Sequence, residues 1–183
     1  MKIIRILITL LLAGIFSLTF AATNNNYDDV CTAWCLKPIP KKYYVGGLVG
    51  LGEGAGNSNI GLAWGGFAGY RFNSNMAGEF IFDRTPRGTA NNTAHTNLFG
   101  GAVKVSLPFS PRLDGFAKLG LGVVNSGEYT GAASSTRFGF LIGTGADYYV
   151  SKSVALSAQL LGTMGGTDAD TFAVLGGVAY LFA

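Results

Sequence analysis

Charged side chains are scarce in this sequence of 183 residues, of which only 13% are Asp, Glu, Lys or Arg. That is about half of the roughly 25% typical of soluble domains. Because 49% of the residues are hydrophobic and glycine follows no Gly-X-Y period, a disordered or collagen-like chain is excluded. Without Lys2 and Arg5 of the leader described below, 11 basic residues stand against 10 acidic ones. A chain this close to neutral lacks the excess of basic residues that binds nucleic acid, so we exclude nucleic acid as a partner.

Residues that build catalytic and metal sites are also few, with two cysteines and one histidine. His95 stands among Asn and Thr residues, without the acid and nucleophile that a hydrolytic triad requires. Three residues separate Cys31 from Cys35, where the C-x-x-C redox motif has two, and no second pair or nearby histidine completes a metal site. We predict a structural disulfide between these cysteines, and no catalytic, cofactor or metal site.

Beyond the first segment, no apolar run approaches the roughly 20 residues of a spanning helix. Residues 1–21 have a basic start, an apolar run from Ile6 to Phe16 and small residues at the end, which is the pattern of a cleaved signal peptide. We therefore expect export. An exported chain without spanning helices can lie within a membrane only as a closed barrel.

Glycine, by contrast, is abundant, with 28 residues, and apolar residues alternate with small or polar ones from Tyr43 onward. This alternation predicts an all-β fold, an eight-stranded antiparallel up-and-down transmembrane β-barrel over residues 43–183. A periplasmic N-terminal segment, 22–42, would precede it. The expected strands are 43–52, 59–72, 76–84, 96–107, 113–124, 136–150, 154–164 and 170–182.

The two faces of the expected strands differ in size. In the sixth strand, Phe138 and Phe140 share one face, whereas Gly139, Gly143 and Asp147 share the other. Large residues suit lipid, and small ones suit the narrow lumen of an eight-stranded barrel. A soluble sandwich or lipocalin-like barrel would carry Lys, Glu, Thr and Ser on its water-facing side, where this chain has mostly Gly and Ala.

Connections alternate in length, which predicts the orientation of the barrel. They are short after the second, fourth and sixth strands and long after the third and fifth. Short periplasmic turns and long outer loops are typical of bacterial barrels, so both termini are expected in the periplasm. An aromatic girdle is predicted at that side, from Tyr43, Tyr70, Phe72, Phe109, Tyr148, Tyr180 and Phe182. The expected outer loops are 53–58, 84–96, 125–136 and 165–169.

Four segments carry a family resemblance: residues 43–50 (YYVGGLVG), 66–72 (GFAGYRF), 116–122 (FAKLGLG) and 177–182 (GVAYLF). In this order and spacing the chain resembles the OmpA-like eight-stranded outer-membrane barrels, close to the opacity-type surface antigens. The resemblance implies a place in the outer membrane of a Gram-negative bacterium and roles in envelope integrity, adhesion or immune exposure. The implied partners are outer-membrane lipid and lipopolysaccharide, the barrel-assembly machinery, and host or surface ligands.

Alternation also places seven charged residues inside the barrel, three positive and four negative. They are Arg71, Glu79, Asp83, Lys104, Asp114, Lys118 and Asp147. Because an unpaired buried charge is costly, we expect mutual pairing. Glu79, Lys104 and Lys118 lie at similar distances from the short turns, so a link from Glu79 to either lysine would plug the lumen. The alternative is a narrow, porin-like channel that uses the two lysines.

Function in such a scaffold belongs to the outer loops. The candidate contact residues are Arg84, Arg87, His95, Glu128, Tyr129 and Arg137. Three classes of function remain open at this point: a structural or adhesive surface barrel, a narrow channel, and a lipid A-modifying barrel enzyme. The first is the principal prediction, without catalysis.

Overall fold

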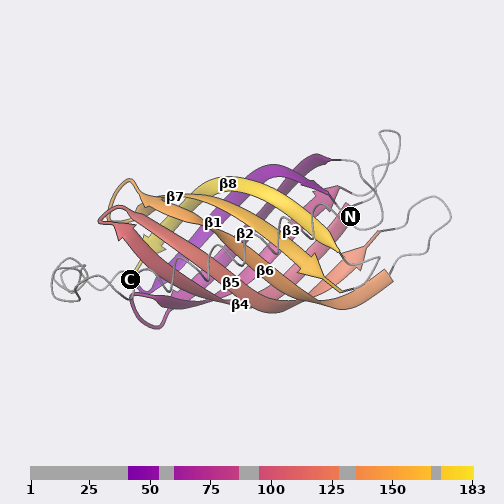
Figure 1. Cartoon of the computed structure of the whole chain (residues 1–183), viewed down its shortest axis with the longest axis horizontal. Coiled ribbons are helices and arrows are strands. Elements are labelled where there is room, and N and C mark those ends of the chain that lie inside the picture. Colours follow the sequence, from indigo (N-terminus) through magenta and orange to yellow (C-terminus); the bar gives the residue numbers. More distant parts are fainter. Residues whose placement is uncertain (1–40, 54–59, 87–94, 128–134, 166–169) are drawn as a thin grey trace. The chain divides into compact units, whose positions relative to one another are not determined.

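The computed structural model describes residues 41–53, 60–86, 95–127, 135–165 and 170–183. These residues form a closed barrel in which each strand pairs antiparallel with its neighbours in sequence, and β1 pairs with β8 (Figure 1). Its strands are β1 (Tyr43–Glu53), β2 (Gly61–Arg71), β3 (Met76–Pro86), β4 (His95–Ser110), β5 (Leu113–Ser126), β6 (Ser135–Tyr149), β7 (Val154–Met164) and β8 (Thr171–Phe182).

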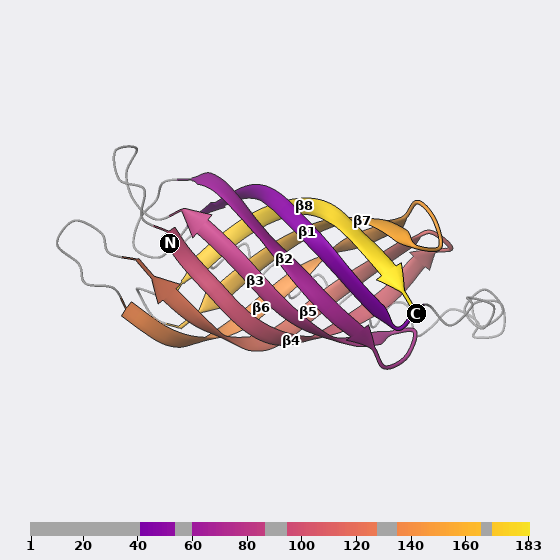
Figure 2. The same ribbon diagram turned by 180° about the vertical axis from the view of Figure 1, so that it is seen from behind.

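The predicted eight-stranded up-and-down barrel is thus confirmed. Figure 2 shows its closure from behind, with β1 between β8 and β2. Nowhere in the described ranges is there a helix of the length and hydropathy needed to cross a membrane. The predicted signal peptide 1–21, most of the segment 22–42, and Cys31 and Cys35 lie outside the described residues.

The alternation of side chains follows the two faces of the barrel wall. On β6, Phe138 and Phe140 are 83% and 63% exposed, whereas Leu141 and Asp147 are buried. The inner face is crowded enough to require glycine, because a Cβ at Gly120 would lie 2.7 Å from the Cα of Ala102. A lumen this narrow holds only side chains.

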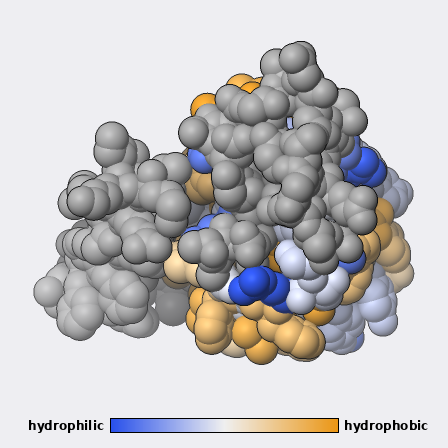
Figure 3. All heavy atoms as spheres, turned by 90° about the vertical axis from the view of Figure 1, so that its right-hand side faces the viewer, coloured by the Kyte–Doolittle hydropathy of each residue, from blue (hydrophilic) through white to orange (hydrophobic). Residues whose placement is uncertain are grey.

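Aromatic rings gather on the outer wall at both ends. At the end with the short turns, ring contacts run from Phe72 to Tyr70, Tyr43, Phe182 and Tyr180, with centroids 5.1–6.3 Å apart. At the other end, Phe82 contacts Trp64 at 5.5 Å and Phe99 at 4.9 Å. Figure 3, seen from that end, shows apolar residues over much of the outer wall.

The separation of these aromatic bands matches a membrane. On β6, Phe138 and Tyr148 both face outward and are ten residues apart. At about 3.3 Å per residue and a strand tilt of about 40°, their separation along the barrel axis is about 25 Å. That is the height of the apolar band in outer-membrane barrels.

The short turns lie together at one end of the barrel, on the left in Figure 1. Between β2 and β3, the side-chain Oδ1 of Asn73 accepts hydrogen bonds from the backbone N–H groups of Asn75 and Met76, at 2.9 and 2.8 Å. Between β6 and β7, Oγ of Ser151 accepts from the backbone N–H groups of Ser153 and Val154. Such side-chain caps close a strand reversal within a few residues.

The predicted turn at 108–112 is too long. β4 continues to Ser110, so only Pro111 and Arg112 connect it to β5. The register shifts between Pro108 and Ser110, which marks a β-bulge. A proline without an N–H is tolerated where a bulge interrupts the ladder, and so Pro108 does not end the strand.

Candidate functional site

The seven charges predicted inside the barrel lie on β2 to β6. Arg71, at the end of β2, is half-buried, and the other six are at most 5% exposed. These six are Glu79, Asp83, Lys104, Asp114, Lys118 and Asp147.

Glu79 on β3 lies at the centre of the luminal ion cluster, a name used here for Glu79, Lys104, Lys118 and Asp147. Its Oε2 is 2.6 Å from Nζ of Lys118, and its Oε1 is 3.5 Å from Nζ of Lys104. The hydroxyl of Tyr44, on β1, donates a hydrogen bond of 2.7 Å to the same Oε1. One carboxylate therefore joins β3 to β4, β5 and β1.

The two lysines are held from their other sides as well. Nζ of Lys104 lies 2.6 Å from Oδ2 of Asp147 on β6. Nζ of Lys118 donates a hydrogen bond of 2.8 Å to Oε1 of Gln159 on β7. Because two carboxylates balance two ammonium groups, the cluster is electrically neutral while it spans strands on different sides of the lumen.

Aromatic rings contact both ammonium groups. Nζ of Lys104 lies 4.1 Å from the centroid of Phe116, and Nζ of Lys118 lies 4.8 Å from that ring and 5.0 Å from the ring of Phe67. A cation over a ring face is favourable, and more so where water is excluded. These contacts fill the space around the ion pairs.

Arg71 extends the polar network toward the short-turn end. One of its guanidinium nitrogens donates a hydrogen bond of 2.7 Å to the hydroxyl of Tyr149, on β6. The guanidinium also lies 5.5 Å from the ring centroid of Tyr44, which contacts Glu79 in turn. The network therefore reaches from the centre of the lumen to the ends of β2 and β6.

Asp83 does not join this network. It is 2% exposed, and its Oδ1 has no hydrogen-bond partner among the described residues. Buried Ile81 lies between Asp83 and Glu79 on the inward face of β3. Mutual pairing, which we expected of all the interior charges, thus fails for this carboxylate.

Three polar members of the network were missing from the sequence-based site. They are the uncharged residues Tyr44, Tyr149 and Gln159, which a search for inward charges does not find. The available signal was the alternation of inward and outward residues along β7. It places Gln159 inward, and this residue is 3% exposed.

The candidate loop residues fall into two groups. Arg84, His95 and Arg137 are in strands β3, β4 and β6. The expected loops 84–96 and 125–136 were drawn too wide, because β3 ends at Pro86, β4 begins at His95, β5 ends at Ser126 and β6 begins at Ser135. The ladder continues there because Arg84 pairs with Asn97, His95 with Pro86 and Arg137 with Val124. The other candidates, Arg87, Glu128 and Tyr129, lie outside the described residues.

No group of three or more His, Cys, Asp or Glu side chains in the described ranges is arranged to hold a metal ion. In the luminal ion cluster, the carboxylates of Glu79 and Asp147 are paired with lysines.

Residues 8–182 match the family of the outer membrane protein beta-barrel domain. The chain belongs to this family. Membership places it among the β-barrels of the Gram-negative outer membrane, as the resemblance implied. No curated protein is similar enough in sequence to count as a relative of this chain.

Solved structures agree with the family in fold. Neisserial surface protein A is 18% identical, with a TM-score of 0.64 over 76% of this chain and 97% of that one. The N-terminal β-barrel domain of Pseudomonas aeruginosa OprF is also 18% identical, with a TM-score of 0.61 over 79% and 100%. Ail, the attachment invasion locus protein of Yersinia pestis, is 14% identical, with a TM-score of 0.54 over 78% and 97%. Ail has also been solved with the heparin analogue sucrose octasulfate.

Proposed function

We propose that this chain is a non-conducting surface protein of the outer membrane, in which the barrel is a scaffold and the long connections contact external ligands. The luminal ion cluster is the observation that carries the proposal. Glu79 and Asp147 bind Lys104 and Lys118 across the lumen at 2.6–3.5 Å.

A channel would need these ion pairs to separate. Pores that select by charge present rings of unpaired side chains to the passing ion, whereas both lysines here contact carboxylates. Breaking a buried ion pair costs about 3–5 kcal/mol, because a charge remains without its partner. The porin-like channel is therefore the second candidate, and catalysis on lipid A is the third.

The proposed orientation has the short turns and both chain ends in the periplasm and the long connections outside. Arg84 and His95, at the ends of β3 and β4, and Arg137 on β6 then lie near the outer rim. Arg87, Glu128 and Tyr129 are candidate contacts from the sequence alone, because they lie outside the described residues. Support for an external ligand comes from Ail, a protein of the same fold that was solved with the heparin analogue sucrose octasulfate. Lipopolysaccharide, host or surface ligands and the barrel-assembly machinery are the partners we propose.

Planar-bilayer recordings test the closed lumen. The wild-type protein should give no stable conductance steps. A variant with Glu79, Lys104 and Lys118 all replaced by serine should conduct, which shows that the assay detects an open lumen in the same scaffold. Stable wild-type steps that change with Lys104→Ser would overturn the proposal in favour of the channel.

A loop exchange tests the surface role. Segments 87–94 and 128–134 are replaced by short Gly-Ser turns, and adhesion of the expressing bacteria to host cells and to sulfated glycans is compared with wild type. Binding should disappear while the purified barrel still migrates differently before and after boiling in SDS. Unchanged binding contradicts the surface role. An altered lipid A acylation pattern after incubation with the protein would favour the enzyme instead.

A further inference from the structure

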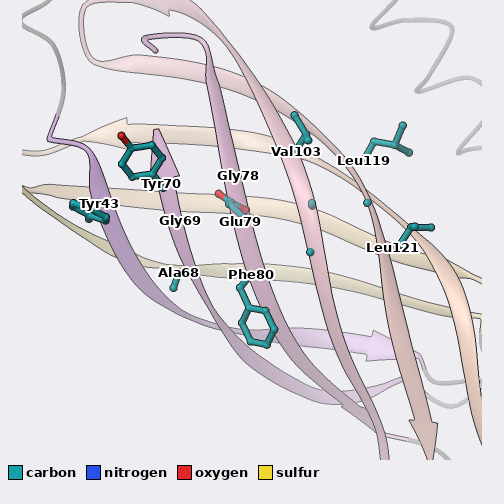
Figure 4. Close-up of a pocket in the computed structure, with 13 residues that line it drawn as sticks. Tyr43, Ala68, Gly69, Tyr70, Gly78, Glu79, Phe80, Val103, Leu119 and Leu121 are labelled. Carbon is teal, nitrogen blue, oxygen red and sulfur yellow. The ribbon is translucent and has the colours of Figure 1, made fainter. Parts of the chain in front are cut away.

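The outer wall of the barrel carries a groove near the end with the short turns (Figure 4). It is a shallow, open groove with a volume of about 680 Å³. Tyr43 and Tyr70 lie at one end of the groove and Leu119 and Leu121 at the other, with Phe80 along one side.

Gly101 opens the floor of this groove, whereas the ring of Phe72 lies beside the neighbouring Gly78, 3.2 Å from where a Cβ would stand. Gly78 and Gly101 occupy outward positions on β3 and β4, between larger outward residues. A Cβ at Gly101 would meet only the carbonyl oxygen of Glu79, at 3.9 Å, so the space above it is open. The walls protrude on either side, since Phe80 and Leu121 are 57% and 63% exposed.

The groove faces hydrocarbon in a membrane-embedded barrel. Its lining side chains are apolar apart from the tyrosine hydroxyls, because the carboxylate of Glu79 points into the lumen and only its backbone reaches the groove. An apolar groove with hydroxyls at the end nearer the membrane surface matches an acyl chain below a polar headgroup.

Charge at the short-turn end indicates which headgroup. Every exposed or half-exposed charged side chain that the structure describes there is basic; these are Lys41, Lys42, Arg71, Arg112 and Lys152. The acidic residues at this end, Asp114 and Asp147, are buried in the lumen. Exposed Lys42 directly precedes Tyr43 of the groove, and its carbonyl accepts a hydrogen bond of 2.7 Å from the backbone N–H of Arg71.

We propose that this groove binds an anionic phospholipid, with an acyl chain over Gly101 and the phosphate at Lys42. The proposal rests on the proposed orientation, which puts the short-turn end in the phospholipid leaflet and not in the lipopolysaccharide leaflet. The lipid is recognised by charge at its headgroup and by shape along its chain.

Native mass spectrometry of the purified full barrel tests both parts. Phosphatidylglycerol and phosphatidylethanolamine with identical acyl chains are added at equal concentration, and the lipid-bound fractions are compared. The wild type should prefer phosphatidylglycerol by about fivefold, the effect of one cation near an anionic headgroup. Lys42→Gln should abolish that preference, whereas Lys152→Gln, an equal charge change at another turn, should keep it.

A second pair of variants tests the groove itself. Gly101→Leu fills it and should lower binding of both lipids by about tenfold, as expected for the loss of roughly two buried methylenes. Gly47→Leu is the matched control, because Gly47 is exposed on β1, outside the groove, and a Cβ there meets nothing within 4 Å. It should bind lipid as wild type does. All four variants must show the heat-dependent gel shift of a folded barrel.

Three results would overturn the inference. Equal loss of lipid in Gly101→Leu and Gly47→Leu would show that lipid does not bind in the groove. Stronger binding of lipopolysaccharide than of phosphatidylglycerol, abolished by Gly101→Leu, would assign the site to the other leaflet. A cross-linked dimer that disappears only in Gly101→Leu would make a second copy the occupant. Conductance and loop exchange do not depend on this groove, so failure here leaves the proposed surface role standing.

Discussion

Lys118 and Glu79 form an ion pair of 2.6 Å although the whole of β4 lies between their strands. The strand between them contributes Lys104, which stands opposite Lys118 in the β4–β5 register. Like charges directly opposite each other on neighbouring strands repel. Carboxylates from the flanking strands β3 and β6 offset this repulsion, because Glu79 reaches both lysines and Asp147 binds Lys104.

Glu79→Gln removes the carboxylate that both lysines share. Lys118 then loses its ion pair and keeps uncharged contacts, with Oε1 of Gln159 and the rings of Phe67 and Phe116, so we expect a loss of about 3–5 kcal/mol in the free energy of unfolding. Urea titration of the refolded barrel in lipid vesicles measures it. The control, Glu53→Gln at the half-exposed end of β1, should change stability by less than about 0.5 kcal/mol. Equal effects of the two substitutions would contradict the central role of Glu79.

Asp83→Asn should raise the free energy of unfolding, whereas Glu79→Gln lowers it. Asp83 is buried without an ion-pair partner in the described part of the chain, so the amide removes an uncompensated charge and should stabilise the barrel by about 1 kcal/mol at pH 8. Asp147→Asn is chemically the same change at a paired carboxylate and should destabilise it. The same urea titration compares them, and a destabilised Asp83→Asn would mean that the buried carboxylate has a partner in solution.

Phe82→Leu tests the aromatic band at the end opposite the short turns. Phe82 contacts two rings, Trp64 and Phe99, and aromatic pairs contribute about 0.5–1.5 kcal/mol each beyond burial. We expect a loss of about 1–2 kcal/mol in vesicles. Phe138→Leu, at an outward ring without a ring contact in the described residues, should cost less. Similar losses would assign the effect to lipid contact and not to ring pairing.

Gly120→Ala should prevent tight closure of β4 on β5. The added methyl would lie 2.7 Å from the Cα of Ala102 and 2.8 Å from its Cβ, and neither atom can move without shifting the strand. We expect a loss of about 2 kcal/mol or more, in the range of overpacked cores, seen as a smaller heat-shifted fraction on gels. Gly47→Ala, where the new Cβ meets nothing within 4 Å, should fold as wild type.

Cysteine labelling checks the proposed orientation. In a background with Cys31 and Cys35 replaced by serine, Asn125→Cys near the end of β5 should react with a membrane-impermeant maleimide on intact cells. Ser74→Cys, in the β2–β3 turn, should react only after the outer membrane is opened. Both side chains are exposed in the structure, so a reversed pattern would reverse the orientation.

The alternation of the sequence was sufficient to predict the barrel and the direction of most side chains. Parity placed Glu79, Lys104 and Lys118 inside, because successive residues of a strand must face opposite sides of the wall. It also placed Phe138 and Phe140 outside, where they are exposed. Strand ends were less predictable, since Pro108 suggested a turn but lies at a bulge.

The expected link from Glu79 to a lysine is present, but alternation alone could not predict the other partners within the lumen. Tilt and stagger of the strands decide which inward side chains meet, and these quantities are not written in the spacing of one strand. Asp83 and Glu79 are both inward on β3 and only four residues apart. Among the described residues, Oδ1 of Asp83 has no hydrogen-bond partner, whereas Glu79 contacts two lysines. The two carboxylates differ in their contacts because of the distances across the lumen, which the sequence positions do not reveal.

The pairing of Tyr43 with Phe182 also determines how the barrel can fold. These partners lie in the first and last strands of the barrel, so the ladder between them has the largest loop-closure cost and cannot begin before β8 is available. Until then β1 keeps an unpaired edge, the kind of edge that invites association with other chains. A chain cut before Thr171 therefore leaves open edges on β1 and β7, and we expect it to be bound by chaperones or degraded and not to close into a smaller barrel.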